Sequence, residues 1–305
     1  MRKFHSNGKL LLTGEYVVLD GASALAFPTK YGQSLEVENS EKERIHWQSF
    51  DEKGEVWFEE FFDLKNFENQ TGQAEISNTL SKILREARNL NPDFLIKSDG
   101  INIKTKLDFP RIWGLGTSST LINNIAQWAA VNPFDLLKNS FGGSGYDIAA
   151  AQSDAPILYE LKNKRPEFRK VHLPWDFTDS LFFVHLNKKQ DSKEGIERYR
   201  NASVRPKDIE NISDISKKLL QCRTLKDFEN LMESHEKVIS EIIKMESVKQ
   251  RLFPNFNGIV KSLGAWGGDF VLATGAESEM DYFRNKGFGT IISFSEMVKQ
   301  KTPLL

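Results

Sequence analysis

The chain of 305 residues has almost no cysteine and no excess of charge of either sign. Its single cysteine, Cys222, excludes an intramolecular disulfide and any metal cluster built from several cysteines, as is typical of a reducing compartment. Lysine and arginine total 41 against 42 for aspartate and glutamate, so no global field attracts nucleic acid. Any anion that the protein binds must therefore be held by a local site.

Long apolar runs are also missing. The start, MRKFHSNGKLLLTGEYVVLDG, has an early positive pair, but Gly14 and Glu15 interrupt its apolar residues and a small-residue cleavage site is absent. No stretch approaches the roughly 18 uncharged apolar residues that a membrane span needs. We therefore expect a cytoplasmic protein that neither crosses a membrane nor binds nucleic acid.

The common nucleotide-binding signatures are absent as well. The chain contains no GxxxxGK[ST] loop, no GxGxxG fingerprint, and no HRD or DFG sequence. These absences exclude a Walker-type phosphate loop, a dinucleotide-binding βαβ unit and the protein-kinase catalytic loop. If the protein binds a nucleotide, it must hold the phosphates with a motif of another kind.

What the chain does have is a change of hydrophobic period between its halves. Period-two patterns predict strands joined as an antiparallel meander over residues 33–38, 44–50 and 55–62. A helical stripe then predicts a helix over residues 76–90, which is followed by a strand at 101–109 and a second helix from residue 117. The first half therefore ends as a strand, a turn and a helix.

The second half alternates strands and helices. Apolar patterns predict strands at 156–161, 179–186, 269–274 and 289–294, and helices at 207–221, 225–246, 255–263 and 279–286. This order indicates an α+β protein in which helices cover strands. The length allows two domains or one large one, and the second half starts near residue 155.

A glycine turn precedes the helix that is predicted from residue 117. In PRIWGLGTSST, residues 110–120, Gly114 and Gly116 flank a leucine, and Thr117, Ser118 and Ser119 follow. Glycine allows the backbone to approach an anion, and a helix start offers free N–H groups and a partial positive charge. Polyphosphate binding is one interpretation, and a turn with an ordinary helix cap is the other.

Four segments resemble, in order, the sequence blocks of the GHMP kinases. They are SNGKLLLTGEYVVLDGASALAFP at 6–28, PRIWGLGTSST at 110–120, GSGYDIAAA at 143–151 and KSLGAWGGDFVLATG at 261–275. The family includes galactokinase, homoserine kinase, mevalonate kinase and phosphomevalonate kinase. The resemblance implies two domains: an N-terminal domain over residues 1–154, like ribosomal protein S5 domain 2, and a ferredoxin-like C-terminal domain over residues 155–305.

The resemblance also implies roles for residues of the nucleotide side. Asp147 matches the catalytic aspartate, and Lys9 matches the lysine that accompanies it in mevalonate kinase-like members. Ser118 stands where the family has a magnesium ligand. The residues that match the ATP phosphate loop are Gly114, Leu115, Gly116, Thr117, Ser118 and Ser119. Without these blocks, Asp147 would be interpreted as a helix-start carboxylate and Lys9 as an exposed strand lysine.

On the acceptor side, the implied contacts come from three blocks. They are Glu15, Tyr16, Ser144, Gly145, Gly264, Ala265, Gly267, Gly268 and Asp269. Strand ends and turns are the alternative interpretation of the same residues. Trp113 and Trp266 occupy positions where the family is variable or has glycine, so we expect their rings to narrow the site.

The implied function is an ATP-dependent, magnesium-dependent phosphotransferase that moves the γ-phosphate to an alcohol or phosphate group of a small molecule. The blocks are most similar to phosphomevalonate kinases, and mevalonate kinase or another GHMP kinase is the alternative. Residues 119–146 lack the glutamate from which many members take a second metal ligand. A catalytically inactive nucleotide-binding or regulatory protein therefore stays open, as does the choice between monomer and homodimer.

Overall fold

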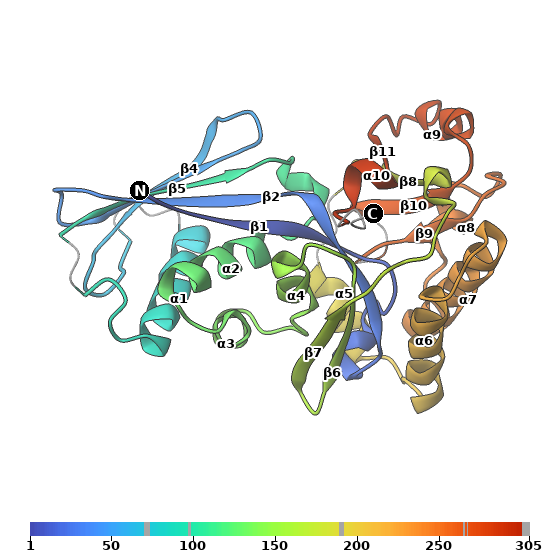
Figure 1. Ribbon diagram of the computed structural model, residues 1–305, viewed down its shortest axis with the longest axis horizontal. Coiled ribbons are helices and arrows are strands. Elements are labelled where there is room, and N and C mark those ends of the chain that lie inside the picture. The colour runs from blue at the N-terminus through green and yellow to red at the C-terminus, as the bar shows by residue number, and fades with distance from the viewer. Residues whose placement is uncertain (70–73, 97–98, 189–191, 265, 267, 301–305) are drawn as a thin grey trace. The chain divides into compact units, whose positions relative to one another are not determined.

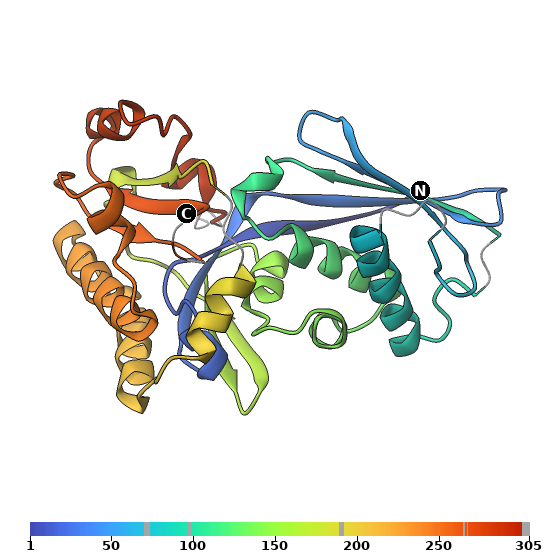
Figure 2. The same cartoon turned by 180° about the vertical axis from the view of Figure 1, so that it is seen from behind.

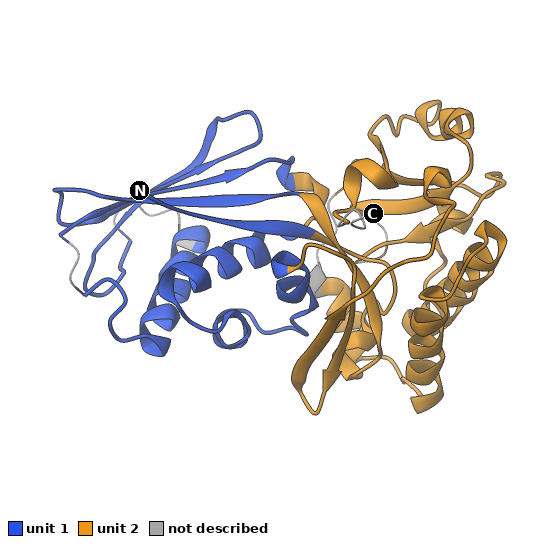
Figure 3. Ribbon diagram, viewed as in Figure 1, with its two compact units in different colours: residues 1–8, 31–111, 116–152 blue, residues 9–30, 112–115, 153–305 orange. Residues whose placement is uncertain are grey.

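Strand β2 (Ala24–Asn39) runs through both of the units into which the chain divides in the computed structural model (Figures 1 and 3). The structure describes residues 1–69, 74–96, 99–188, 192–264, 266 and 268–300. Unit 1 contains residues 1–8, 31–111 and 116–152, and unit 2 contains residues 9–30, 112–115 and 153–305. The domain boundary between residues 154 and 155 stays a prediction.

Unit 1 contains a sheet with the strand order β4-β3-β5-β2, and β1 also pairs with β2. The strands other than β2 are β1 (Arg2–Leu11), β3 (Ile45–Phe50), β4 (Val56–Phe62) and β5 (Ile101–Leu107). The predicted strands exist, but the predicted simple meander is wrong. Strand β5 lies between β3 and β2 and runs parallel to β3, because a helix crosses back between β4 and β5.

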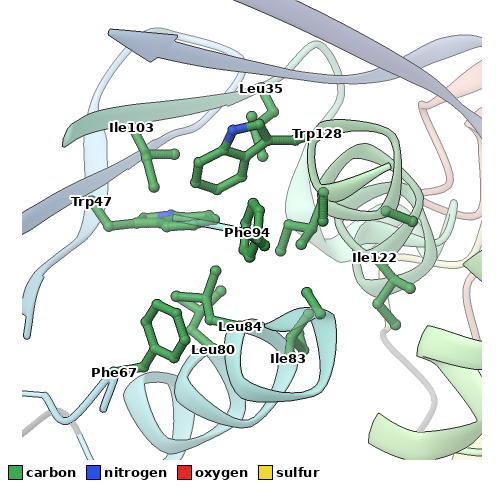
Figure 4. Close-up of a cluster of buried hydrophobic side chains, with 14 of the residues drawn as sticks. Leu35, Trp47, Phe67, Leu80, Ile83, Leu84, Phe94, Ile103, Ile122 and Trp128 are labelled. Carbon is green, nitrogen blue, oxygen red and sulfur yellow. The ribbon is translucent and has the colours of Figure 1, made fainter. Parts of the chain in front are cut away.

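The helices of unit 1 pack against this sheet, as Figures 1 and 2 show. They are α1 (Ala74–Leu90), α2 (Thr117–Ala129), α3 (Pro133–Ser140) and α4 (Tyr146–Gln152). In Figure 4 the core side chains Trp47, Phe67 and Leu84 lie close together, with Trp128 above them. The apolar stripe that predicts α1 is therefore its buried face.

Unit 2 begins with the hairpin β6 (Ile157–Lys162) and β7 (Arg165–Lys170), and β6 pairs with the first residues of β2. Its second sheet has the antiparallel order β11-β8-β10-β9. The strands are β8 (Leu181–His185), β9 (Val260–Ser262), β10 (Phe270–Thr274) and β11 (Ile291–Ser293). Numbered within this sheet, the order is 4-1-3-2.

Helices fill the two crossovers of this sheet. Between β8 and β9 lie α5 (Ser192–Arg200), α6 (Pro206–Leu219), α7 (Leu225–Ile243) and α8 (Val248–Leu252). Between β10 and β11 lie η4 (Glu277–Met280) and α9 (Asp281–Arg284), and α10 (Phe294–Met297) follows β11. The resulting β-α-β-β-α-β arrangement is ferredoxin-like. The predicted α+β class and two-domain organisation of the fold are confirmed.

The helix predicted over residues 255–263 is wrong. This segment contains turns and then β9, whose three residues are buried and pair with β10. A short apolar run that is buried on both faces has no period that separates a strand from a helix. Its neighbours in the sheet decide its conformation.

Among the described residues, no helix has both the length and the mean hydropathy that crossing a bilayer requires.

Two positions on α1 test the core of unit 1. Leu84 is fully buried in the cluster of Figure 4, whereas Ile76 on the same helix is 38% exposed. We expect Leu84→Ala to lower the free energy of unfolding by about 2–5 kcal/mol, because it leaves a cavity. Ile76→Ala should change it by less than about 1 kcal/mol. Urea unfolding followed by circular dichroism measures both, and equal losses would contradict this core.

Candidate functional site

The N-terminus of α2 is the predicted anion site, and its free donors are backbone N–H groups. Gly116 is its N-cap with φ 90°, a left-handed conformation that favours glycine. The first hydrogen bond of the helix runs from the Thr120 N–H to the Gly116 carbonyl, at 3.0 Å. The N–H groups of Thr117, Ser118 and Ser119 thus precede the helical ladder and share the positive end of the helix dipole.

The hydroxyl groups of this turn have different environments. Ser119 is buried and its Oγ donates to the Gly116 carbonyl at 2.9 Å. The buried Thr120 hydroxyl donates to Gln33 Oε1 at 2.8 Å, on β2. Ser118 is exposed, whereas Thr117 is half-buried. Ser119 and Thr120 therefore hold the turn, and the Ser118 hydroxyl is accessible to a ligand or metal.

A buried polar network fixes α2 against the strands of unit 1. Ser6 on β1 donates to Asn124 Oδ1 at 2.7 Å and accepts from Asn123 Nδ2 at 2.8 Å. The Nδ2 group of Asn124 donates to the Gln33 carbonyl at 2.9 Å. Because buried polar groups lose much free energy when they lose their partners, this network sets the rotation of α2 and the direction of its first turn.

The preceding part of the glycine turn belongs to unit 2, where Lys9 holds it. The Lys9 Nζ donates to the Gly114 carbonyl at 3.0 Å, and the Lys9 N–H donates to the Leu115 carbonyl at 2.9 Å. Leu115 is fully buried. The structure thus brings the predicted lysine to the predicted phosphate loop, and its positive charge lies at Gly114.

Asp269 packs against the same glycine. A Cβ placed on Gly114, where φ is 65°, would lie 2.3 Å from the Asp269 Cγ, so a larger residue would be strained there and would displace the Asp269 side chain. Asp269 itself has φ 54°, and its N–H donates to the Lys188 carbonyl at 2.6 Å. Lys9 and Asp269 therefore place opposite charges beside one turn of unit 2.

The other predicted residues of the segment 261–275 differ in their surroundings. Gly268 is buried, and Gly264 has φ 65° with open space where a side chain would lie. Ala265 and Gly267 lie outside the described residues. Trp266 is 2% exposed, so its ring lies in the interior of unit 2 and not on a ligand-facing surface.

Trp113 packs within unit 2 as well. Its ring is half-buried and meets Phe270 edge to face, with ring centroids 5.5 Å apart. His185 accompanies this pair, and its Nε2 lies 3.2 Å from the Ile112 carbonyl. These aromatic contacts hold the segment that enters the glycine turn.

Asp147 lies in the first turn of α4 in unit 1. Ser144 is buried and Gly145 has φ 87°, which together form the turn into the helix. Asp147 is half-buried, and its Oδ1 accepts from the Ile148 N–H at 3.0 Å. Since α4 packs against α2, unit 1 carries both the predicted catalytic acid and the anion site of α2.

Tyr16 is largely buried beneath α5. Its ring stacks on Tyr199 with centroids 5.8 Å apart, and a Cβ on Gly195 would meet its hydroxyl at 2.6 Å. The Tyr199 hydroxyl in turn donates to Asp20. Burial and this carboxylate raise the pKa of Tyr199. Tyr16 has φ 63°, which is rare for a bulky residue and indicates a constrained turn.

Glu15 is 1% exposed and belongs to a buried ionic cluster in unit 2. The Lys261 Nζ lies 2.5 Å from Glu15 Oε1 and 3.2 Å from Glu236 Oε1. The His235 Nε2 lies 3.1 Å from Glu15 Oε2. Burial raises the pKa of Glu15 to about 7 and also raises that of Glu236, although Lys261 opposes both shifts.

The partners of Glu15 do not appear among the residues predicted from the sequence. The signal was present, because His235 and Glu236 interrupt the apolar stripe of the helix predicted over 225–246. Lys261 likewise stands in the short apolar run IVKSL. A charged residue inside an apolar stripe indicates a buried pair, but its partner is far away in the sequence.

The described residues contain no group of three or more histidine, cysteine, aspartate or glutamate side chains that could by itself hold a metal ion. Magnesium in phosphate sites takes one or two protein ligands and completes its shell with water and phosphate oxygens. The accessible Ser118 hydroxyl at the anion site of α2 fits this mode of binding.

Several solved structures with the same fold are small-molecule kinases. Mevalonate kinase of Methanococcus jannaschii aligns with 99% of this chain and 98% of its own, with a TM-score of 0.73 and 16% identity. Phosphomevalonate kinase of Streptococcus pneumoniae, in complex with phosphomevalonate and AMPPNP, aligns with 96% of this chain and 98% of its own, with a TM-score of 0.68 and 16% identity. These matches cover nearly the whole chain.

Galactokinase of Lactococcus lactis, complexed with galactose, aligns with 98% of this chain and 93% of its own, with a TM-score of 0.69 and 14% identity. The sequence matches no protein-family model and no curated protein sequence. The chain therefore has the two-domain GHMP kinase fold, and the predicted resemblance is confirmed at the level of structure.

The contact between Gly114 and Asp269 can be tested against a glycine of the same backbone conformation. Gly114 and Gly264 both have φ 65°, but only the first would place its Cβ against a side chain. We expect Gly114→Ala to lower the free energy of unfolding by about 1–3 kcal/mol more than Gly264→Ala, because of overpacking. Urea unfolding measures the difference. Adding Asp269→Ala should recover most of it, and equal losses in the two single variants would contradict the contact.

Proposed function

We propose that this protein is an ATP-dependent small-molecule kinase whose acceptor is a phosphorylated alcohol of the phosphomevalonate type. The observation that carries the proposal is the glycine turn at the start of α2, held by Lys9 at one end and by a buried polar network at the other. Such a turn with an accessible Ser118 is suited to the phosphates of a nucleotide.

The nucleotide would be ATP with Mg²⁺. The backbone N–H groups of Thr117 to Ser119 would bind phosphate oxygens, and the Ser118 hydroxyl would hold the metal. Bound magnesium neutralises phosphate charge during phosphoryl transfer. The Streptococcus pneumoniae phosphomevalonate kinase that shares this fold is described with AMPPNP, an observation that supports ATP as the donor.

Asp147 is the proposed catalytic residue. A carboxylate can accept the proton of an acceptor hydroxyl, or orient an acceptor phosphate for in-line attack. Lys9 matches the lysine that accompanies this aspartate in mevalonate kinase-like members, and it is the second proposed catalytic residue, whose positive charge would offset charge on the acceptor oxygen. Asp147 lies in the first turn of α4, a short helix of unit 1, and is half-buried, whereas the next residues of the helix are buried.

The acceptor class rests on the sequence blocks. GEYVVLDG, GSGYDIAAA and GAWGGD resemble phosphomevalonate kinases more than galactokinase. Structures of the same fold include mevalonate kinase and galactokinase, so mevalonate and a sugar are the competing acceptors. ADP release with Mg-ATP and phosphomevalonate, mevalonate, homoserine or galactose distinguishes them, and turnover with phosphomevalonate is the expected result.

Replacing the catalytic acid tests the role of Asp147. We expect Asp147→Asn to lower kcat by about 10²-fold or more, because the amide cannot accept a proton, while ATP binding by calorimetry stays unchanged. Asp135→Asn is the matched control, since Asp135 is exposed on α3 and should leave turnover intact. Unchanged turnover in Asp147→Asn would remove this residue from the proposal. ATP binding without turnover in the wild type would instead support a non-catalytic nucleotide-binding protein.

A side chain at Gly116 tests the anion site. We expect Gly116→Val to weaken ATP binding by about tenfold or more, or about 1.4 kcal/mol, because the side chain enters the space where phosphates approach the backbone. Gly54→Val controls for strain, since Gly54 has φ 85° in the turn between β3 and β4. Calorimetry measures both affinities. An ATP affinity equal to that of the wild type in Gly116→Val would show that the turn does not bind phosphate.

A further inference from the structure

The hydrogen bonds of His235 assign its protons. The Gly14 N–H donates to His235 Nε2 at 3.0 Å, so the lone pair of this nitrogen points at Gly14. The ring is fully buried, and its pKa lies well below the usual value because of burial and the charge of Lys261. His235 is therefore neutral, with its hydrogen on Nδ1.

Glu15 approaches the same nitrogen. Its Oε2 lies 3.1 Å from His235 Nε2 without the geometry of a hydrogen bond donated by the ring. A carboxylate oxygen and a nitrogen lone pair repel at this distance unless a hydrogen lies between them. Because the lone pair of Nε2 already accepts from Gly14, Nε2 carries no hydrogen, and the repulsion falls when Glu15 is the neutral acid.

The rest of the cluster favours a neutral Glu15. The titratable groups that face it are His235 and Glu236 from α7 and Lys261 from β9. Glu236 Oε2 accepts from the Ser262 hydroxyl at 2.9 Å, a bond that stabilises its ionised form. With Glu15 neutral, Lys261 and Glu236 balance each other, whereas an ionised Glu15 would leave one uncompensated negative charge in the interior.

We propose that Glu15 and His235 form a proton-controlled positioning pair for the turn at residues 14–16. In the protonated state, Glu15 is a carboxylic acid, His235 carries its hydrogen on Nδ1, and Nε2 accepts from Gly14. Loss of one proton leaves a carboxylate, and the ring then carries its hydrogen on Nε2 and donates it to Glu15. The proton balance is a transfer from Glu15 to Nε2 and a release from Nδ1.

The protonated and deprotonated states of the pair leave the same number of buried N–H groups without a hydrogen bond. The Nδ1 of His235 is buried without a partner among the described residues, so the protonated state leaves the ring N–H unsatisfied. The deprotonated state satisfies the ring N–H and deprives the Gly14 N–H of its acceptor. Each state thus leaves one buried N–H group unpaired, and the charge of Glu15 decides between them.

The consequence falls on the constrained turn that carries Tyr16. Release of the Gly14 N–H removes a bond that ties this turn to α7, next to a residue with φ 63°. The raised pKa of Glu15, about 7, places the change near neutral pH. Any effect on an acceptor rests on the proposed kinase function, whereas the tautomer change itself does not.

Nitrogen NMR of the full chain with ¹⁵N-labelled histidine tests the proposal without any assay of activity. The chain has five histidines, so the ring resonances are few. His235→Asn assigns the signal or, if that variant does not fold, replacing the other four histidines one at a time does so. We expect Nδ1 to be the protonated nitrogen at pH 5.5 and Nε2 at pH 8.5, with a midpoint near pH 7. One tautomer throughout, or an imidazolium titrating near pH 6.5, would overturn the proposal.

Two variants identify the proton carrier. Glu15→Gln should abolish the pH dependence and keep the hydrogen on Nδ1, because the amide cannot ionise. Glu236→Gln should keep the tautomer change and move its midpoint to lower pH, since a neighbouring negative charge is lost. The opposite result, with the change surviving in Glu15→Gln and lost in Glu236→Gln, would place the proton on Glu236. If Glu15→Gln does not fold, the midpoint shift in Glu236→Gln alone decides.

Discussion

Lys261 places its ammonium group in the interior of unit 2, where the side chain is fully buried. Such burial is costly unless the charge is paired and hydrogen-bonded, and Lys261 meets Glu15, Glu236 and the Ser262 carbonyl. These partners come from the turn after β1, from α7 and from β9 itself. Glu15 is 246 residues away from Lys261 in the sequence. One buried cation therefore requires that distant segments of the chain meet in one arrangement.

Buried polar contacts also hold the glycine turn in place. Lys9 binds both carbonyls before Gly116, the Asp269 side chain occupies the space that a Cβ on Gly114 would need, and Ser119 closes the first turn of α2. The groups that face outward are then backbone N–H groups and one serine hydroxyl. Rigid support beneath a few exposed polar groups is the general design of a binding site, and here most of that support is buried polar structure.

Kinases with about one residue in six identical share this fold. Low identity is compatible with a common fold because the core requires apolar residues of suitable volume more than particular ones. Trp47 and Phe67 in unit 1, for example, fill space that other large residues could fill. The fold therefore does not identify the substrate. The function must be argued from the residues of the glycine turn, of α4 and of the acceptor side.

The sequence by itself determined most helices and strands, the α+β class and the position of the glycine turn before α2, because local periodicity and glycine placement act over a few residues. It pointed to Lys9, which the structure places on strand β1 with its Nζ at the Gly114 carbonyl, and to Ser118 and Asp147, which lie in the first turns of helices. Tertiary structure alone decided that β5 lies between β3 and β2, that residues 260–262 form a strand, and that Glu15 is paired with His235 and Lys261. These features depend on partners distant in the chain, whose contacts leave no local pattern.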